Sequence, residues 1–429
     1  MNCAGCEKSA TSFLCDPRWK VSRLGLERVS ELLDRMGRPQ NRLKFVHITG
    51  TNGKGSTAAM IASMLTQANL KTGLFTSPCL ERINEQIQVN GREISADELE
   101  GAAAVCRQAV DQMSDHPTEF EMLVATALEH FAASGCDLVV LEVGMGGLRD
   151  ATNVVEQTEV AILTTISLDH TAILGSTTAE IAAEKAGIIK PGCTAVSVGQ
   201  DPQVERVLRE ICAERNVPLI FCDERELFDT PSLSQDGLHF SYRGMPIRLP
   251  LLGWYQLQNA AAAVTAVAQL NRRGWKIPDE AVRRGLERVS WPGRLELLCR
   301  QPFFLLDGAH NPQGAQTVAD TLNRVAPGER FTFLVGILAD KDWKGTLSPV
   351  FPMAERFLIT TPPNPRAMPG EELAGNLRDL GFEAQVFASP EEGARQALKL
   401  AGPEGRICAF GSLYQAGMIR RTILKDSRL

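Results

Sequence analysis

Apolar and polar positions alternate with two different periods along the first half of the chain. Residues 137–143 are apolar without a break from Leu138 to Leu141, as in a strand that is covered on both faces. Such strands occur in parallel sheets with helices on each side, so we expect an α/β fold. The other strand-like runs lie at residues 44–49, 73–76, 159–166, 194–198 and 218–221, and helical spacing appears in residues 58–68, 96–113, 121–134, 178–187 and 204–215.

The pattern changes twice in the second half of the chain. Residues 238–252 contain the short, turn-separated runs of a small β-hairpin, and residues 256–270 form an alanine-rich helical pattern. The sequence Trp-Pro-Gly-Arg at residues 291–294 ends a helical pattern over residues 279–289, because proline and glycine interrupt helices. After this boundary a second α/β series predicts strands at residues 303–306, 331–336, 356–360 and 406–410 and helices at residues 315–325, 370–380 and 390–400.

The composition is that of a globular protein with more than one domain. A length of 429 residues favours two or three domains with separate cores, and hydrophobic residues make up 44% of the chain. The net charge of −6 gives no electrostatic reason to expect nucleic acid or an anionic membrane as a partner. No apolar run approaches the roughly 18 residues of a membrane span, and the N-terminal segment lacks the apolar stretch of a signal peptide. We therefore expect a cytoplasmic protein.

The use of cysteine favours a reducing compartment. Eleven cysteines are scattered along the chain, and most should be buried as small hydrophobic residues. Cys3 and Cys6 form a C-x-x-C pair, but no second pair follows at the spacing of a zinc site. We interpret the two residues as reduced thiols in an N-terminal tail.

The most informative segment is a glycine-rich turn between a predicted strand and a predicted helix. It reads Gly-Thr-Asn-Gly-Lys-Gly-Ser at residues 50–56. Backbone N–H groups of such a loop and of the following helix point at a bound phosphate, and the lysine adds a full charge. The common nucleotide loop has lysine directly before serine or threonine, whereas Gly55 separates Lys54 from Ser56 here. A purely structural turn is the alternative, but the lysine between two glycines indicates a nucleotide site.

A carboxylate follows the apolar run at residues 138–141. Glu142 ends this predicted strand, where a charge is costly unless it meets a cation or hydrogen-bond donors. Ligands of parallel sheets bind at the carboxyl ends of the strands, and an acidic residue there commonly binds Mg²⁺ or its water. A glutamate that turns to solvent is the alternative. The glycines at positions 144, 146 and 147 let a ligand approach the backbone and favour the metal.

His170 and Lys185 form a third candidate cluster. His170 follows the predicted strand at residues 159–166, which ends at the same sheet edge as Glu142, so we interpret it as a metal ligand; a structural histidine is the alternative. Lys185 shares a predicted helical face with Ile181 and Ile188, and partial burial there would let it lose its proton readily. The sequence alone nevertheless favours a surface lysine whose stem lies along the protein and whose amine reaches water.

Polar turns also follow the strands predicted after residue 302. Asp307 opens the turn at residues 307–312, and Asp342 follows the strand predicted at residues 331–336. Arg294, at the boundary, is placed to reach a phosphate. Loops with helix-capping side chains are the alternative, and a serious one for Asp342.

Together these residues resemble folylpolyglutamate synthase and the related dihydrofolate synthase of the Mur ligase superfamily. Each motif alone is weak, but many occur in the family's order over nearly the whole chain. They lie at residues 25–29, 50–56, 76–78, 81–84, 120–121, 141–147, 150–153, 168–170, 184–188, 255–256, 259–260, 291–294, 307–312, 340–342 and 411–414.

The resemblance implies an α/β protein of two domains. Residues 1–292 would form a P-loop ATPase domain with a mostly parallel sheet, a small β-hairpin element and the pterin or folate site. Residues 293–429 would form a smaller Rossmann-like domain that binds glutamate. The family ligates L-glutamate to dihydropteroate or to the γ-carboxylate of tetrahydrofolate polyglutamates. ATP first phosphorylates the carboxylate, and the amine then displaces phosphate through a tetrahedral intermediate. A synthase that acts on folylpolyglutamates alone is the alternative.

The resemblance also implies a role for each matching residue. Lys54, Glu142, His170, Lys185 and His310 would be catalytic, and Lys185 matches a lysine that the family carbamylates with CO₂. One Mg²⁺ would be held by Ser77, Glu142 and Ser56 and a second by His170, with K⁺ as a further candidate cation. ATP would contact Thr51, Asn52, Gly53, Lys54, Gly55, Ser56, Asn259, Arg294 and Asp307. Glutamate would lie near His310 and Ser412, and the pterin or reduced folate would lie near Ser22, Arg23, Leu24, Thr118, Glu119, Phe120, Glu121, Arg149, Asp150 and Ala151.

Three departures from the family pattern lie near the expected pterin site. Cys79 stands where the family usually has histidine, and Leu148-Arg149 replaces arginine followed by leucine. Residues 1–20 lack a tyrosine- and leucine-bearing helix that is common there. These differences leave the ligase chemistry intact and leave open which pterin is used.

Two other functions are alternatives. A cell-wall Mur ligase would carry a uridine-nucleotide domain before the phosphate loop, and a loop that begins at Gly50 leaves no room for it. A non-catalytic ATP-binding regulator would not need Glu142, His170 and Asp307 at strand ends. We expect a monomer, as is common in the family.

Overall fold

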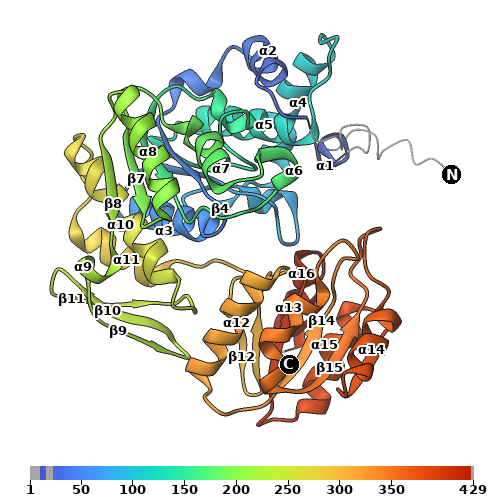
Figure 1. The fold of residues 1–429 in the computed structure, drawn as a ribbon. Coiled ribbons are helices and arrows are strands. Elements are labelled where there is room, and N and C mark those ends of the chain that lie inside the picture. The colour runs from blue at the N-terminus through green and yellow to red at the C-terminus, as the bar shows by residue number, and fades with distance from the viewer. Residues whose placement is uncertain (1–9, 16–22, 427–429) are drawn as a thin grey trace. The chain divides into compact units, whose positions relative to one another are not determined.

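The computed structural model of the chain describes residues 10–15 and 23–426. They pack into two compact units, each built from sheets and helices (Figure 1). The first unit takes its described residues from Met1–Asp229 and Leu257–Val289, and the second from Thr230–Gln256 and Ser290–Leu429. The chain therefore passes from the first unit to the second at Thr230, returns to the first unit at Leu257, and passes to the second unit again at Ser290.

An eight-stranded sheet forms the centre of the first unit, in the order β4-β3-β2-β5-β1-β6-β7-β8. In this order, every neighbouring pair in the row β2-β5-β1-β6-β7-β8 is parallel. Strands β3 and β4 add an antiparallel edge next to β2. Parallel neighbours require crossover connections, which the intervening helices provide. The strands are β1 Phe45–Thr49, β2 Thr72–Phe75, β3 Ile87–Val89, β4 Arg92–Glu93, β5 Leu138–Glu142, β6 Thr158–Leu163, β7 Thr194–Val198 and β8 Leu219–Cys222.

Helices cover this sheet, and several begin at side-chain caps. Thr118 and Glu121 form a reciprocal capping box at the start of α5, as Ser95 and Glu98 do at α4. The helices are α1 Ala10–Leu14, α2 Glu27–Arg35, α3 Lys54–Gln67, α4 Ala96–Val110, α5 Glu119–Ala133, α6 Thr171–Leu174, α7 Thr178–Lys185, α8 Pro202–Glu214, α9 Glu224–Leu227, α10 Gln256–Arg272 and α11 Asp279–Arg288, with short 3₁₀ turns η2 Pro39–Arg42, η3 Ile83–Gln86, η4 Ala151–Val154 and η5 Ala186–Ile188.

The strand register places polar and apolar side chains on one face of the sheet. His47 of β1 is paired with Leu141 of β5 and Ala161 of β6, and Thr49 is paired with Leu163. Because side chains alternate along a strand, these residues point to the same face. The same face packs against α5 near Leu141 and against α7 and α8 near Ala161.

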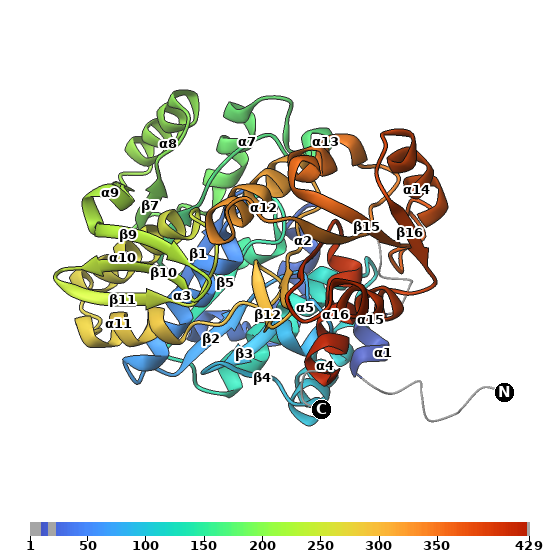
Figure 2. The ribbon, with the colours of Figure 1, turned by 90° about the horizontal axis from the view of Figure 1, so that it is seen from below.

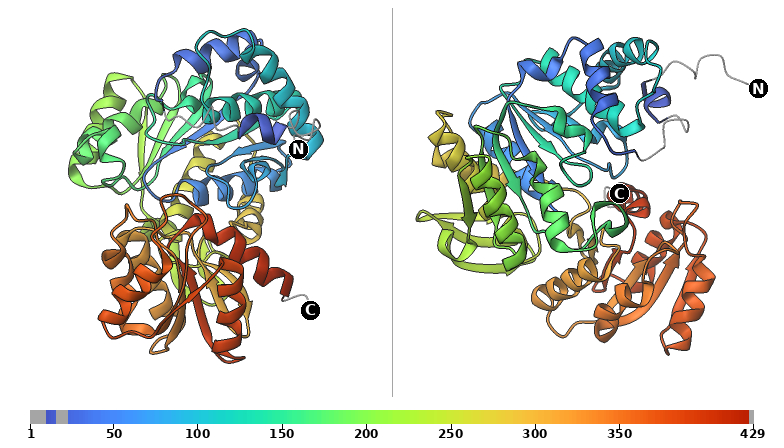
Figure 3. Two further views of the ribbon diagram at one scale, coloured as in Figure 1. Left: turned by 90° about the vertical axis from the view of Figure 1, so that its right-hand side faces the viewer. Right: turned by 45° about the horizontal axis from the view of Figure 1, so that its top comes forward.

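The second unit contains two sheets (Figures 2 and 3). A six-stranded sheet has the order β12-β13-β17-β14-β15-β16 and is parallel except for β12, and a three-stranded sheet has the order β11-β10-β9. The elements are β9 Phe228–Ser234, β10 Gly237–Tyr242, β11 Met245–Leu249, β12 Glu296–Arg300, β13 Phe303–Leu306, α12 Pro312–Val325, β14 Phe331–Val335, α13 Trp343–Leu347, η6 Ser348–Met353, β15 Ala354–Thr360, α14 Gly370–Asp379, β16 Ala384–Phe387, α15 Pro390–Ala401, β17 Arg406–Phe410 and α16 Leu413–Asp426.

The predicted α/β class is confirmed, and most predicted elements lie within a few residues of the observed ones. Strand β9 was not predicted: its sequence carries Asp229, Pro231 and two serines, and most of its residues are exposed. The hairpin predicted at residues 238–252 is therefore part of a three-stranded sheet.

The nine cysteines of the described residues are free, and six of them are buried. Among the described residues, no helix combines the length and the apolar character that a membrane crossing requires.

Candidate active site

The glycine-rich turn lies between β1 and α3 and closely approaches its neighbours. A Cβ on Gly50 would lie 1.8 Å from Thr164 Oγ1, and one on Gly53, at φ +91°, would lie 2.3 Å from Asn259 Oδ1. Only glycine fits these positions without displacing a neighbour. Thr51 fixes the middle of the turn, because its N–H donates to Thr165 O at 2.7 Å and its hydroxyl donates to Ser167 O at 3.0 Å.

Helix α3 starts directly after this turn. Lys54 is its first residue, and its Nζ donates to Gly50 O at 2.8 Å and to Thr51 O at 3.2 Å. Ser56 is buried in the first turn of the helix. Backbone N–H groups at a helix N-terminus, a glycine turn and a lysine amine are the elements of the anion site that the sequence predicts here.

Lys185, the last residue of α7, brings a second amine to the same oxygen. Its Nζ donates to Gly50 O at 2.9 Å, and the residue is only 4% exposed. Burial, and then the charge of Lys54, lower the pKa of Lys185 to about 7. The favoured expectation of a surface lysine is therefore wrong. The end of α7 packs beneath the glycine turn at residues 144–147, where a Cβ on Gly147 would meet Lys185 O at 2.6 Å.

Glu142 is buried at the end of β5, next to Ile48 of β1. Its Oε2 accepts a hydrogen bond from the backbone N–H of Ser77 at 3.2 Å. The alternative of a glutamate that faces solvent is wrong, because the residue is only 4% exposed. The structure thus brings together two of the residues expected at one metal, Glu142 and Ser77.

His170 is exposed and has a left-handed backbone, with φ +50°. Its Nε2 lies 3.8 Å from Asp169 Oδ2. Both residues line a pocket together with the two lysines. The complete lining is Thr49, Gly50, Lys54, Val143, Gly144, Met145, Gly146, Asp169, His170, Leu174 and Lys185.

The described residues contain no group of three or more His, Cys, Asp or Glu side chains that could hold a metal ion. The candidates are instead single oxygen groups, such as those of Glu142, Ser77 and Ser56, near a phosphate cradle. Mg²⁺ is commonly held by one or two carboxylates together with substrate phosphates and waters. This donor set therefore fits Mg²⁺ better than a metal that needs a full cage of protein ligands.

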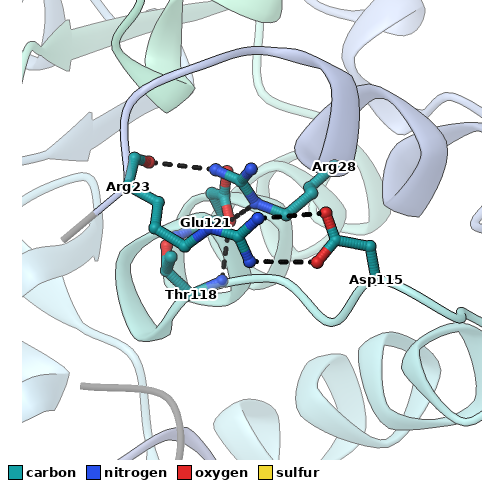
Figure 4. A network of polar contacts seen from close by, with 5 residues as sticks. All are labelled: Arg23, Arg28, Asp115, Thr118 and Glu121. Carbon is teal, nitrogen blue, oxygen red and sulfur yellow. Dashed lines mark hydrogen bonds and ion pairs between the residues drawn. The ribbon is translucent and has the colours of Figure 1, made fainter. Parts of the chain in front are cut away.

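Three of the residues matched to a pterin site, Arg23, Thr118 and Glu121, belong to a polar network around a buried ion pair (Figure 4). Arg28 of α2 donates from Nη2 and Nε to Glu121 of α5, at 2.9 and 3.2 Å, and also to Arg23 O at 3.0 Å. Glu121 accepts a further bond from Thr118 N at 2.6 Å. Arg23 forms an exposed ion pair with Asp115 at 2.9 Å. The network joins the segment before α2 to the N-terminus of α5.

Phe120 links this network to the glycine turn. A Cβ on Gly144 would lie 2.5 Å from Phe120 Cζ, so the ring packs directly on that turn. Leu24 and Glu119, which are sequence neighbours of Arg23 and Phe120, are half-buried. Arg149 is exposed, and its Nε lies 3.3 Å from a carboxylate oxygen of Glu184. Asp150 and Ala151 are buried, and burial raises the pKa of Asp150. Ser22 lies outside the described residues.

The second unit has a polar cluster after β13. Asp307 is buried and accepts from Leu295 N at 2.7 Å and from Ala309 N at 2.6 Å, and burial raises its pKa while Arg294 opposes that rise. His310 Nδ1 lies 3.0 Å from Gly308 O. Ser412 is buried at the start of α16 and accepts from Tyr414 N at 3.3 Å. Asp342 caps α13 through Gly345 N, as its structural alternative predicted.

Sequence reasoning missed three polar residues that the structure places behind these clusters. Arg28 pairs with Glu121, and His47 and Thr152 are hydrogen-bonded to each other next to Asp150. A signal was present for His47, because a histidine inside an apolar strand needs a polar partner. No signal pointed to the partner itself, since Thr152 is 105 residues away.

Comparisons with known proteins agree with this geometry. Residues 48–267 match the Mur ligase middle domain, and residues 293–413 match the Mur ligase, glutamate ligase domain. A dihydrofolate synthase/folylpolyglutamate synthase of Bacillus subtilis is 37% identical over 413 residues, covering 93% of this chain and 95% of that protein. The protein of the same name from Escherichia coli is 31% identical, with 96% and 94% covered.

Solved structures give the same result. A Mycobacterium tuberculosis folylpolyglutamate synthase complexed with ADP superposes with a TM-score of 0.85 at 32% identity, covering 96% of this chain and 97% of that one. The structure of E. coli FolC in complex with DHPP and ADP has a TM-score of 0.83 at 30% identity, with 97% of each chain covered. The chain therefore belongs to the Mur ligase superfamily, in the family of folylpolyglutamate and dihydrofolate synthases.

Proposed function

We propose that this chain is an ATP-dependent ligase that joins L-glutamate to a pterin carboxylate through an acyl phosphate. The acceptor is dihydropteroate, the γ-carboxylate of a tetrahydrofolate polyglutamate, or both. The observation that carries the proposal is the pocket in which Lys54 and Lys185 meet at the glycine turn, in a chain that matches such synthases over almost their whole length. An enzyme that extends folylpolyglutamates alone is the alternative.

The proposed chemistry requires positioning and charge more than a nucleophilic side chain. Lys54 would leave Gly50 O and bind the β- and γ-phosphates of ATP, together with backbone N–H groups of the turn from Gly53 onward. Phosphoryl transfer is promoted mainly by holding donor and acceptor in line and by neutralising charge. Asn259, whose side chain lies against Gly53, supports the same turn from α10.

We assign the metal ligands from the oxygen and nitrogen donors that the side chains near the phosphate loop offer. Glu142, Ser77 and Ser56 would hold one Mg²⁺ and His170 a second, with K⁺ as a further candidate cation. Glu142 lies buried at the carboxyl end of a parallel strand and beside Ser77, which supports this assignment. When bound, Mg²⁺ would neutralise the phosphate oxygens and orient them for transfer.

We further propose that Lys185 is carbamylated. Its amine is buried and has a pKa of about 7, so a large fraction is neutral near neutral pH, and only a neutral amine adds to CO₂. The product is a carbamate anion and a released proton. An anion at this position would face Lys54 and the pocket instead of adding a second cation to it.

The remaining roles follow from the family match. Arg294 and Asp307 would contact the nucleotide, and His310 and Ser412 the incoming glutamate. Arg23, Leu24, Thr118, Glu119, Phe120, Glu121, Arg149, Asp150 and Ala151 would surround the pterin, along with Ser22. We also propose that the protein acts as a monomer in the cytoplasm.

The decisive experiment measures ATP consumption with each acceptor separately. We expect release of ADP and phosphate when L-glutamate is supplied with dihydropteroate, with tetrahydrofolate, or with each in turn. Mass spectrometry should show a product one glutamate heavier than the acceptor. Turnover with both acceptors would establish a bifunctional enzyme, and turnover with tetrahydrofolate alone the alternative. Absence of phosphate release with both acceptors would overturn the ligase proposal.

A further inference from the structure

His47 is a buried polar residue for which the proposed reaction has no use. It lies in the middle of β1, at the centre of the eight-stranded sheet, and has no exposed surface. Its Nε2 lies 2.9 Å from the hydroxyl of Thr152, whereas its Nδ1 has no hydrogen-bond partner. Burying a polar ring is costly, so its single interaction should have a structural purpose.

The hydrogen bond of His47 continues through Thr152 to Asp150. Thr152 Oγ1 donates to Asp150 Oδ1 at 2.6 Å, and Thr152 N donates to the same oxygen at 3.0 Å. A hydroxyl has one proton, and the short contact with the carboxylate uses it. Nε2 of His47 must therefore carry the ring proton and donate it to Thr152. Burial lowers the pKa of His47 to about 3, so the ring stays neutral in this role.

The chain of bonds ends at the glycine turn of the pocket. Asp150 Oδ2 accepts from the backbone N–H of Met145 at 2.8 Å. Two residues after His47, on the same face of β1, Thr49 Oγ1 donates to Gly146 O at 2.6 Å. One strand thus holds neighbouring residues of the turn at two points, directly through Thr49 and indirectly through His47.

The held turn connects the reaction pocket with the residues matched to the pterin. Met145 and Gly146 line the pocket with Lys54 and Lys185, and Gly144 packs against Phe120. The phosphate loop has separate supports, since Thr51 is fixed by Thr165 and Ser167. A loosened turn should therefore disturb the acceptor and leave the nucleotide in place.

We propose that His47 and Thr152 are positioning residues, which hold Asp150 and the turn at residues 144–147 so that the pterin carboxylate meets the phosphate loop. This inference rests on the proposed ligase function. Misplacement of reacting groups by about 1 Å can cost up to a hundredfold in rate. Loss of the hydrogen bonds that join His47, Thr152 and Asp150 should therefore lower kcat/KM for the pterin acceptor by roughly ten- to a hundredfold.

Thr152→Val and Thr152→Ser form a matched pair for the test. Valine keeps the shape of threonine without the hydroxyl, and serine keeps the hydroxyl without the methyl group. We expect the valine variant to lose kcat/KM for the acceptor while its KM for ATP stays within about twofold of wild type, and the serine variant to recover most of the activity. Thermal unfolding of both variants checks that they are folded to the same extent.

A second measurement does not depend on turnover. The chain has six histidines, and ¹⁵N spectra of histidine-labelled protein distinguish the two ring tautomers. The signal of His47 is identified by its loss in His47→Gln. We expect the Nε2–H tautomer, unprotonated at Nδ1, from pH 5 to 8.

The outcomes separate the inference from the function on which it rests. If wild-type protein turns over but the valine and serine variants behave alike, or ATP binding weakens as much as acceptor use, the positioning role is wrong. An Nδ1–H tautomer for His47 also overturns it. If wild-type protein consumes no ATP with either acceptor, the ligase proposal fails first and the positioning role with it.

Discussion

At the scale of single residues, the carbonyl oxygen of Gly50 is the point where two lysine amines meet. It accepts hydrogen bonds from Lys54 at 2.8 Å and Lys185 at 2.9 Å. Two cations on one oxygen repel each other strongly at a buried site, which is one reason why the pKa of Lys185 falls to about 7. The arrangement therefore favours one charged and one neutral or anionic group, and the two lysines should have different functions.

Lys54→Ala should abolish turnover and leave the fold intact. The amine would neutralise the transferred phosphate, and removing one such group commonly costs about a hundredfold or more in kcat. The loop is a surface element whose backbone is held by Thr51, so stability should change little. Turnover and circular dichroism of the variant and of Lys71→Ala, which changes an exposed lysine, test this. Wild-type rates in Lys54→Ala would contradict the role of the loop.

The carbamylation of Lys185 should depend on pH. Because the pKa of Lys185 is lowered to about 7, its amine is mostly protonated at pH 6 and mostly neutral at pH 8. Carbamate formation should therefore increase as pH rises across this range. A ¹³C signal from labelled bicarbonate should appear in wild-type protein and be absent in Lys185→Met. No lysine carbamate at pH 8 in metal-loaded protein would count against the modification.

The same shift has a consequence for stability. The unfolded chain holds a proton on Lys185 up to about pH 10.5, whereas the unmodified folded protein releases it near pH 7. The destabilising effect of burial is therefore complete below pH 7 and is relieved as pH rises toward 10.5. In bicarbonate-free buffer at pH 6, Lys185→Met should resist urea better than wild-type protein. Equal or lower resistance would contradict the burial of a charged amine.

At the scale of elements, the sequence predicted the repeated strands and helices because their apolar positions recur with a clear period. Strands such as β5 and β17 are buried on both faces and are unmistakable. Strand β9 is mostly exposed and polar, so its pairing with β10 depends on the whole unit and left no pattern. The burial of Lys185 was equally invisible, because it results from the packing of α7 beneath a turn that lies about 40 residues earlier in the chain.

The ion pair between α2 and α5 should matter for stability. Arg28 and Glu121 have side chains that are 9% and 3% exposed, and removing one partner leaves the other charge buried. Arg28→Ala should therefore lower the free energy of unfolding by about 3–5 kcal/mol. Arg23→Ala is the matched control, because its ion pair with Asp115 is largely exposed and should contribute little.

Urea unfolding of the two variants measures this difference. A loss of stability in Arg28→Ala no larger than in Arg23→Ala would show that the buried pair is replaced by water or by other donors. Because Arg28 also donates to Arg23 O, the variant should in addition loosen the segment before α2. Proteolysis of the folded protein near Arg23 would report that loosening.

At the scale of the whole molecule, the first unit depends on a segment that returns from far along the chain. Helix α11 packs along α3, and Ser63 Oγ donates to Gly285 O at 2.7 Å across 222 residues. Helix α3 begins with Lys54 and so carries the phosphate loop. The nucleotide site and the late segment Leu257–Val289 should therefore be stabilised together.

Two helical glycines test this coupling. A Cβ on Gly285 would lie 2.4 Å from Met64 Cα, whereas a Cβ on Gly101 of α4 would meet nothing within 4 Å. Alanine improves helix propensity by about 1 kcal/mol at either position, so the difference between the variants reports the packing. We expect Gly101→Ala to raise the free energy of unfolding slightly, and Gly285→Ala to lower it by about 1–3 kcal/mol because α3 must shift.

Calorimetry with and without ATP measures both effects: stabilisation by ATP should be smaller in Gly285→Ala than in Gly101→Ala. Equal unfolding temperatures and equal ATP effects would show that α11 does not support the phosphate loop.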